Sequence, residues 1–247
     1  METMIKSNLK TKVVSKPFDQ ALKELEEDNY RVISLIENAQ LRIQEDSNSD
    51  VSKYGNWTRE GILYIPKKGN FLVRNSPILY SAELATDSHR NGKEFYPTNT
   101  AIEKALQDSV KFPNKSTEIP VNDFKNNPLT AYAFGENAEE YGNFLKEAGI
   151  NAMPVWVADE DYVKKQTKPF ARQMWFRDLG NGSGLGGYGD LDYGNGLRGV
   201  SESGEASAKN IKKSKIETYT PAQIKKVLKE LKLSGLEESI LSNLKSQ

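Results

Sequence analysis

A stretch of small residues between Gly180 and Gly196, GNGSGLGGYGDLDYGNG, constrains the fold of this chain more than any other feature. Eight of its seventeen residues are Gly, and the others are Asn, Ser, Asp, Tyr and Leu. Strand-like segments lie on both sides of it, ARQMWFRDL before and LRGV after. The fold must therefore join two strands through a long connection that carries few side chains.

A phosphate-binding loop is one function that such a stretch suggests, and the sequence argues against it. Phosphate loops need glycines at fixed spacings, followed by a helix whose N-terminus faces the phosphate. Here the Lys-Ser/Thr pair of a P-loop is missing, and a strand-like segment follows. A GxGxxG match at 182–187 carries little weight among so many glycines. We therefore expect no nucleotide site.

Calcium and catalytic sites fit no better. The run GGYGDLDYG resembles a calcium-binding repeat, but Leu191 stands where that repeat needs Asp, and only one copy is present. Asp190 and Asp192 would share one face of a strand, yet nothing supplies the apolar pocket that gives paired carboxylates separate roles. No motif links Ser183 to His89, which we expect on the surface of a helix. We assign no catalytic residue, no metal ligand and no cofactor.

The remaining composition excludes further classes of protein. The chain of 247 residues has no Cys and one His, which rules out disulfides, thiolate sites and metal sites built on two His. Lys plus Arg and Asp plus Glu are 34 each, so nothing favours nucleic acid or an anionic membrane as a partner. Neither a signal-peptide core nor a membrane-spanning run is found. We expect a soluble protein, either cytoplasmic or held on a virion or cell surface through a partner.

Short strands and helices follow one another through the middle of the chain. Runs rich in β-branched and aromatic residues predict strands, and apolar residues three and four apart predict helices. The expected strands are 61–66, 70–79, 150–159, 171–179 and 197–200, and the expected helices are 81–91, 100–110 and 129–148. KKGN at 67–70 predicts a hairpin turn, and Thr100 with Glu103 predicts a capping box. This order is typical of an α+β fold.

The N-terminal part is expected to hold a loose polar tail to residue 17 and then one helix, 18–44. Apolar residues in this segment follow a heptad pattern, with Asn29 as its polar member. The apolar members are Leu22, Leu25, Val32, Ile36, Ala39 and Ile43. Such a helix either packs on its own domain or joins copies of the chain, as a dimer or trimer, through Leu22–Ile43.

The C-terminal part changes character after residue 200. SESGEASAKNIKKSK is small, polar and charged, as linkers are. A helical hairpin is then expected, which begins at Thr220 and Pro221 and is broken at Gly235. We therefore divide the chain into 1–50, 51–200 and 201–247.

The glycine-rich stretch has the residues of a recognition surface. It lacks Lys, Glu, Gln, Met, Trp and Thr, and it contains Tyr, Ser, Gly, Asn and Asp. Antibody-like paratopes use the same set, with Tyr as a rigid anchor among small adaptable polar residues. The alternative is that the stretch is only a flexible surface loop.

Taken together, ARQMWFRDL, the Gly/Asn/Ser/Asp/Tyr stretch and LRGV resemble the variable region of a protein diversified by a diversity-generating retroelement, of archaeal or viral type. In that family, errors at template adenines turn codons of the AAC type into codons for Asn, Ser, Gly, Asp, Tyr and similar residues. The resemblance covers about 172–200 and implies a C-type-lectin-like domain that carries the variable side chains near its end. Here 47 residues follow Val200, whereas the family's variable region usually lies near the chain's end.

The resemblance also implies a role for each residue of the stretch. Buried scaffold positions would be Trp175, Phe176, Leu179, Leu185, Leu191, Leu197 and Val200, and positions fixed for turns or packing would be Ser183, Gly187, Arg198 and Gly199. Variable, ligand-binding positions would be Asp178, Gly180, Asn181, Gly182, Gly184, Gly186, Tyr188, Gly189, Asp190, Asp192, Tyr193, Gly194, Asn195 and Gly196.

These features lead to one functional hypothesis and one alternative. The hypothesis is a non-enzymatic protein that binds a protein or other macromolecular ligand through a diversified surface on a lectin-like α+β domain, with an N-terminal helix and a C-terminal helical hairpin. The alternative is a structural or assembly protein, whose terminal helices dock partners and whose glycine-rich stretch is only a loop. Neither requires nucleic acid or insertion into a membrane.

Overall fold

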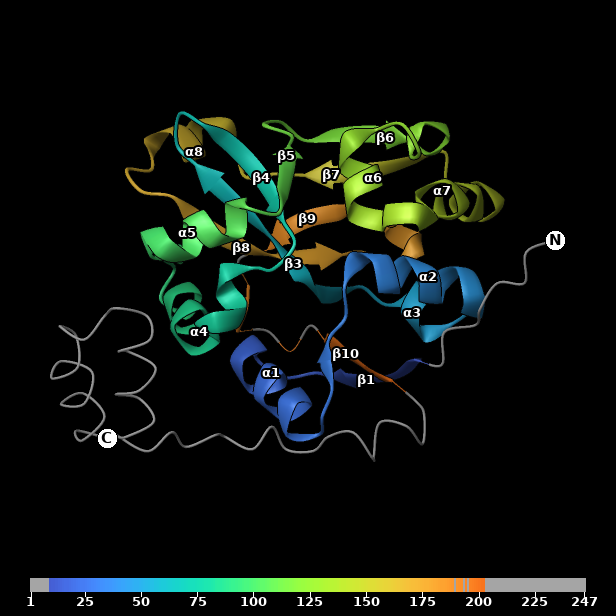
Figure 1. The fold of residues 1–247 in the computed structure, drawn as a ribbon, viewed down its shortest axis with the longest axis horizontal. Helices are drawn as coiled ribbons and strands as arrows, with labels where there is room; N and C mark the ends of the chain where they lie inside the picture. The colour runs from blue at the N-terminus through green and yellow to red at the C-terminus, as the bar shows by residue number, and fades with distance from the viewer. Residues whose placement is uncertain (1–8, 189, 193, 195, 203–247) are drawn as a thin grey trace, which may run out of the picture. The chain divides into compact units, whose positions relative to one another are not determined.

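A computed structural model describes residues 9–188, 190–192, 194 and 196–202 (Figure 1). The expected linker and helical hairpin after residue 202 lie outside the described residues. The strands are β1 (Leu9–Val14), β2 (Arg31–Val32), β3 (Asn56–Ile65), β4 (Gly69–Val73), β5 (Ser109–Phe112), β6 (Thr117–Pro120), β7 (Ala152–Trp156), β8 (Phe170–Phe176), β9 (Leu185–Tyr188) and β10 (Leu197–Glu202).

Helices fill most of the segments between these strands. The α-helices are α1 (Phe18–Glu27), α2 (Leu35–Glu45), α3 (Asp50–Lys53), α4 (Ala82–Arg90), α5 (Asn99–Leu106), α6 (Pro128–Phe134), α7 (Ala138–Glu147) and α8 (Glu160–Lys165). Short 3-10 helices are η1 (Pro77–Tyr80), η2 (Val121–Asp123), η3 (Gly135–Asn137) and η4 (Leu179–Asn181). Within this part of the chain, no helix is both long enough and apolar enough to cross a membrane.

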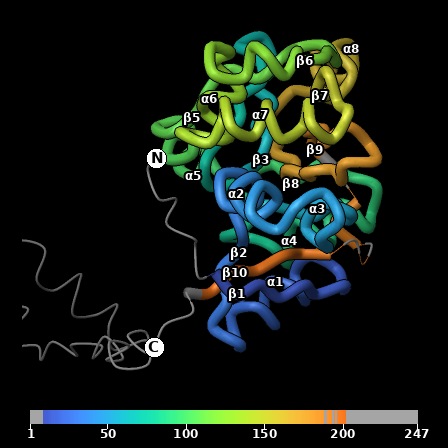
Figure 2. The backbone as a smooth tube through the Cα atoms, turned by 90° about the vertical axis from the view of Figure 1, so that its right-hand side faces the viewer, coloured from blue at the N-terminus to red at the C-terminus, as the bar shows by residue number. Residues whose placement is uncertain are grey.

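All the strands belong to one mixed sheet. Its main path runs β1-β10-β3-β8-β9-β7-β6, while β4 pairs with β3 and β5, and β2 pairs with β10. The pairs β10–β3 and β7–β9 are parallel, and the others are antiparallel. β1 and β10 lie side by side, so the two ends of the described chain meet in the sheet (Figure 2).

The sheet has a hydrophobic core on each face, as the alternation along β3 requires. Ile62 and Tyr64 pack in one core with residues of α2, α6 and α7. Leu63 and Ile65 point the other way, into a core shared with α1, α4 and α5. The helices therefore cover both faces of the central strands, and the expected α+β class is confirmed.

The expected helix over 18–44 is wrong. α1 ends at Glu27, Asn29 takes a left-handed conformation with φ of 62°, and β2 follows. Asn tolerates this conformation better than most residues, which lets the chain reverse there. A new helix, α2, then begins at a capping box in which the Oγ of Ser34 accepts a hydrogen bond from the backbone N of Glu37 at 3.2 Å.

The heptad residues are divided among these elements. Leu25 packs in the core on the α1 face, and Ala39 packs in the core on the opposite face of the sheet. Ile36 and Ile43 are half-buried. The apolar residues that suggested a seam are mostly covered within one chain, which favours packing on the chain's own domain, and self-association through Leu22–Ile43 stays an untested prediction.

The N-terminal part is not separate from the lectin-like region. Six residues expected in a loose tail form β1, which pairs along its whole length with β10, from Leu9 opposite Glu202 to Val14 opposite Leu197. Residues 9–202 belong to one compact unit, with no division near residue 50. Residues 9–50 therefore complete the domain that we expected to begin at residue 51.

Local signals set the remaining elements. The hairpin turn between β3 and β4 is confirmed, with Lys67 and Gly69 at φ of 66° and 104°. Thr98, and not Thr100, caps α5, since its Oγ1 accepts from the backbone N of Ala101 at 3.3 Å. The expected helix 129–148 is two helices, because Gly135 has a φ of 59° and separates α6 from α7.

Candidate functional site

The glycine-rich stretch runs through the middle of the sheet. Its first half forms η4 and then β9, which pairs with β8 on one side and with β7 on the other. Gly186 stands opposite Trp175 of β8 and Trp156 of β7. The stretch is thus partly a strand with neighbours on both edges, and its second half connects β9 to β10.

A tight turn opens the stretch. The Oδ1 of Asp178 accepts hydrogen bonds from the backbone N of Asn181 at 3.0 Å and from its Nδ2 at 3.1 Å. Gly182 and Ser183 follow in left-handed conformations, with φ of 68° and 55°. Asp178 is half-buried and its carboxylate is used by the turn, whereas Asn181 is exposed.

A buried hydrogen-bond network fixes the point where β9 begins. The Oγ of Ser183 accepts from the Nη1 of Arg42 at 2.7 Å and is also hydrogen-bonded to the hydroxyl of Tyr141. Arg42 is fully buried, its Nε donates to the carbonyl oxygen of Val51 at 2.9 Å, and its guanidinium lies 3.9 Å from the ring centre of Phe176. The network ties the glycine-rich stretch to α2 and α7.

The roles of Arg42 and Tyr141 were not expected from the sequence. The helical periodicity of α2 could have indicated Arg42. It lies seven residues after Leu35 and three after Ala39, and therefore on the buried face of the helix. A charged residue on that face needs hydrogen-bond partners inside the fold. Nothing in the sequence indicates that Ser183 is one of them.

The glycines of the stretch differ in the room they leave for a side chain. A Cβ at Gly184 would lie 2.1 Å from Cζ3 of Trp156 and 2.8 Å from the carbonyl oxygen of Pro154. At Gly186 the nearest heavy atom, Cβ of Trp156, would be 3.5 Å away, which is an ordinary contact. Gly186 can therefore accept a Cβ without any movement of the surrounding residues. At Gly184 a Cβ fits only if Trp156 and Pro154 move.

Other glycines are held by backbone conformation or by packing. Gly182 and Gly196 have φ of 68° and 80°, a region that strains other residues. Gly187, expected to be fixed, would place a Cβ 3.0 Å from both Ile62 and Tyr64. Gly199 would place one 2.7 Å from Leu25, in agreement with a packing role.

The second half of the stretch is anchored at one apolar residue. Leu191 is fully buried, and its carbonyl oxygen accepts a 2.7 Å hydrogen bond from the backbone N of Phe18 in α1. Asp190 before it is exposed, Asp192 after it is half-buried, and Gly194 is exposed. A buried anchor thus alternates with positions that reach the surface.

His89 lies close to this segment, at the end of α4. It is half-buried, and neither ring nitrogen has a hydrogen-bond partner among the described residues. Burial lowers the pKa of His89; Glu94 opposes this effect most strongly, Arg172 adds to it, and Asp190 and Asp192 oppose it further. The surface position that we expected for His89 is therefore only partly correct.

The variable positions that we expected are distributed over all degrees of exposure. Gly180, Asn181, Asp190 and Gly194 are exposed, Asp178, Gly182 and Asp192 are half-buried, and Gly184, Gly186 and Gly196 are buried. Gly189, Tyr193 and Asn195 lie outside the described residues, and Tyr188 is described by its backbone alone. That the variable side chains share one contiguous face stays a prediction.

Most of the expected scaffold residues are fully buried. These are Phe176, Leu185, Leu191, Leu197 and Val200. Trp175 and Leu179 are only half-buried, although the Trp175 ring contacts that of Trp57 edge to face at 5.4 Å between centroids. Across the described chain, no three His, Asp or Glu side chains gather as they would around a metal ion.

Comparison with known proteins assigns the fold. No protein-family model and no curated protein matches the sequence. One solved structure does match, described as "Accommodation of massive sequence variation in Nanoarchaeota by the C-type lectin fold". It has a TM-score of 0.59 with this chain, covers 81% of this chain and 99% of its own, and is 19% identical in sequence. The described chain therefore has a C-type lectin fold.

Proposed function

We propose that this protein binds a macromolecular ligand through a diversified surface formed by the glycine-rich stretch on its lectin fold. The observation that carries the proposal is the contrast within the stretch. Its Leu residues and Ser183 are buried in the scaffold, while Asn181, Asp190 and Gly194, which lie beside or between them in the sequence, reach the surface. A surface that changes its sequence needs this division, because the fixed residues hold the backbone for the others.

The composition of the stretch supports the same proposal. Asn, Asp, Gly and Tyr are residues that mutation of AAC-type codons at adenine produces, and the stretch holds no Lys, Glu or Gln. The similar solved structure is itself described in terms of massive sequence variation in Nanoarchaeota. We carry that property to this chain only as a proposal, since the two sequences share 19% identity.

This copy of the surface should bind weakly. Gly offers no side-chain contact and loses more backbone entropy than other residues when it is ordered. Tyr188 and Tyr193 are the aromatic residues of the stretch and would be its anchors. The proposed ligand is a protein or another macromolecule, because a shallow site with scattered small polar groups gives little enclosure to a small molecule.

A comparison of DNA sequences tests diversification directly. We expect a near-copy of the DNA that encodes Arg172 to Val200, next to a reverse transcriptase gene, with differences confined almost entirely to adenines. Differences spread over all four bases, or the lack of such a copy in the complete genome, would contradict the proposal and favour an assembly protein.

Selection from libraries tests binding. One library randomises the codons of Gly180, Gly186, Asp190, Asp192 and Gly194, and a control library randomises the exposed residues Asn122, Asp123, Lys125 and Asn126. We expect folded binders to a panel of unrelated proteins from the first library at a much higher frequency. Equal yields from the two libraries would count against a dedicated binding surface.

A further inference from the structure

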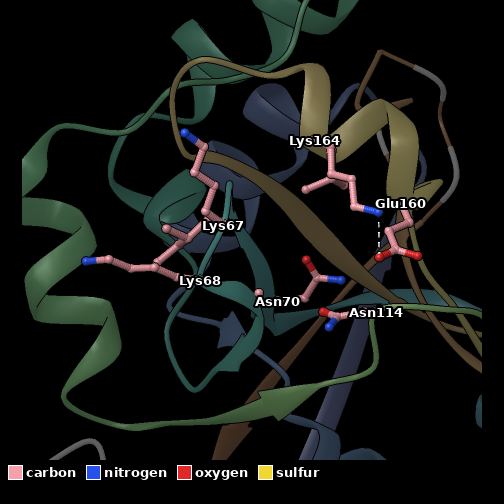
Figure 3. Close-up of a pocket in the computed structure, with 9 residues that line it drawn as sticks. Lys67, Lys68, Asn70, Asn114, Glu160 and Lys164 are labelled. Carbon is pink, nitrogen blue, oxygen red and sulfur yellow. Dashed lines mark ion pairs between the residues drawn. The ribbon is translucent and has the colours of Figure 1, made fainter.

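A pocket lies away from the glycine-rich stretch, between the β3–β4 hairpin and α8 (Figure 3). Its volume is about 260 Å³, and a third wall comes from Asn114 in the turn between β5 and β6. Ile65 and Val163, which are almost fully buried, supply its apolar surface. Among ligand pockets this is a small one, with room for one or two residues of a peptide or a molecule of that size.

Asn70 presents a fixed hydrogen-bond acceptor to this pocket. Its side chain is nearly inaccessible, with 3% of the residue exposed, and its Nδ2 donates to the carbonyl oxygen of Pro113 at 2.8 Å. A carbonyl can only accept, so this bond sets which end of the amide is the oxygen. Among the described residues the Oδ1 of Asn70 has no hydrogen-bond partner, and a ligand in the pocket would have to donate to it.

The charged side chains around the pocket favour an anion. Lys67, Lys68 and Lys164 line it together with one acid, Glu160, and Figure 3 shows the ammonium of Lys164 beside Glu160 while those of Lys67 and Lys68 point outward. The Nζ of Lys164 is 2.9 Å from Glu160 Oε1, and the Nζ of Lys115 is 3.8 Å from Oε2 of the same carboxylate. Lys164 lowers the pKa of Glu160, so this carboxylate stays ionised at neutral pH.

Glu160 holds Lys164 at the pocket without using all of its hydrogen bonds. An ammonium group has three donors; the pair with Glu160 takes one of them, and Asp161 Oδ1 lies 3.9 Å from the same Nζ. Figure 3 shows Lys164 and Glu160 on the α8 side, facing Asn70 and Asn114. A carboxylate that approaches Lys164 would therefore come within reach of the two amide side chains as well.

We propose that this pocket binds the free carboxyl end of a peptide whose last side chain is apolar. The terminal carboxylate would accept from Lys164, and Lys67, whose ammonium points away from the pocket in Figure 3, would have to turn toward it to add a second contact. The last backbone N–H would donate to Oδ1 of Asn70, and the last side chain would pack on Ile65 and Val163. The site does not depend on the binding function proposed for the glycine-rich stretch.

The test uses the full chain and four probes. The first two are a fluorescein-labelled, alanine-rich hexapeptide that ends in leucine, with a free carboxyl group in one version and an amide in the other. Fluorescence anisotropy should give at least about tenfold weaker binding for the amide, since a charge-assisted contact is lost. N-acetyl-leucine should compete for the pocket, and acetate should compete far more weakly.

Two matched variants locate the binding. Lys164→Gln should weaken binding of the free-carboxyl peptide by about tenfold. Lys165→Gln, on the same helix but outside the pocket, should leave it unchanged. Both side chains are exposed, so neither change threatens the fold. In NMR spectra the side-chain amide signals of Asn70 and Asn114 should shift on addition of N-acetyl-leucine.

Three results would overturn the proposal. The amide peptide could bind as well as the acid, acetate could compete as well as N-acetyl-leucine, or the two lysine variants could behave alike. Equal binding of the amide peptide would mean that the terminal carboxylate is not recognised. Equal competition by acetate would mean that the pocket binds small anions in general. Equal behaviour of the two lysine variants would mean that the peptide binds elsewhere on the protein. A failed selection from libraries of the glycine-rich stretch would leave these measurements untouched.

Discussion

Arg42 donates a 2.7 Å hydrogen bond to the side chain of Ser183, 141 residues later in the chain. Both side chains are fully buried, and the hydroxyl of Tyr141 is hydrogen-bonded to each of them. A fixed contact between α2 and the start of β9 thus lies directly under the segment whose sequence we propose to vary. If the contact holds the backbone there, its loss should lower the free energy of unfolding more than it changes the affinity for a ligand.

Ser183→Ala should therefore lower the free energy of unfolding by about 1–3 kcal/mol, because it leaves a buried guanidinium without one of its acceptors. The control is Ser47→Ala, at an exposed position, which should stay within about 0.5 kcal/mol of the parent protein. Urea denaturation followed by tryptophan fluorescence measures both. Similar midpoints for the two variants would mean that the Arg42–Ser183 contact does not support the stretch.

Alanine at two neighbouring glycines should separate fixed from variable positions. Gly184→Ala should cost about 1–3 kcal/mol, because its Cβ would meet Trp156 and the carbonyl oxygen of Pro154. Gly186→Ala has room and should change stability by less than about 1 kcal/mol, partly through a less flexible unfolded chain. Thermal melts of the two variants decide the matter. Equal losses would reject the packing constraint at Gly184 and restore it as a variable position.

The division between scaffold and display predicts very different costs for aromatic residues. Trp57 is fully buried, with ring contacts to Phe18 and Trp175, and Trp57→Ala should cost about 3–5 kcal/mol. Tyr188→Ala and Tyr193→Ala should each stay within about 0.5 kcal/mol if these side chains are displayed. Trp175→Ala should fall between, because Trp175 is half-buried. A large loss at Tyr193 would place that residue in the scaffold.

His89 should make stability depend on pH in a defined direction. Burial lowers its pKa in the folded protein, so the unfolded chain, with a pKa near 6.5, takes up the proton first. The contribution of neutral His89 is complete above about pH 6.5 and is lost as the pH falls toward the lowered value. The stability difference between the parent protein and His89→Gln should therefore shift against the parent between about pH 7.5 and 5. Parallel pH curves for the two proteins would contradict this.

The sequence predicted several strands that join the core. β3, β7, β8 and β10 each contain a short run that was expected as a strand; β3 is buried on both faces, whereas β7 alternates between buried and half-buried residues. The hairpin turn at Lys67–Gly69 was predictable as well, because a local backbone requirement selects the residues. The resemblance of 172–200 to a retroelement variable region gave the fold class, which the structural match confirms.

Features that depend on distant partners were not predictable. Half of the residues of β1 are polar, and its pairing partner β10 lies nearly the whole described chain away. The helix expected over 18–44 failed because Asn29 fits a heptad seam as well as it fits the left-handed turn that it makes. The hydrogen bond between Arg42 and Ser183 was not predictable for the same reason, because the two residues lie in distant segments of the chain.

The position of β9 between β7 and β8 also affects how safely this chain can be mutated. A strand made of LGGY holds little side chain to fix its register, and such a strand at an edge would invite slippage or pairing with another molecule. β8 pairs with all four residues of β9 and β7 pairs with Leu185 and Gly186, so only part of one edge is left, and Leu185 opposite Phe176 sets the register from the buried face. A small side chain at Gly186, where a Cβ has room, can then appear without creating an aggregation-prone edge.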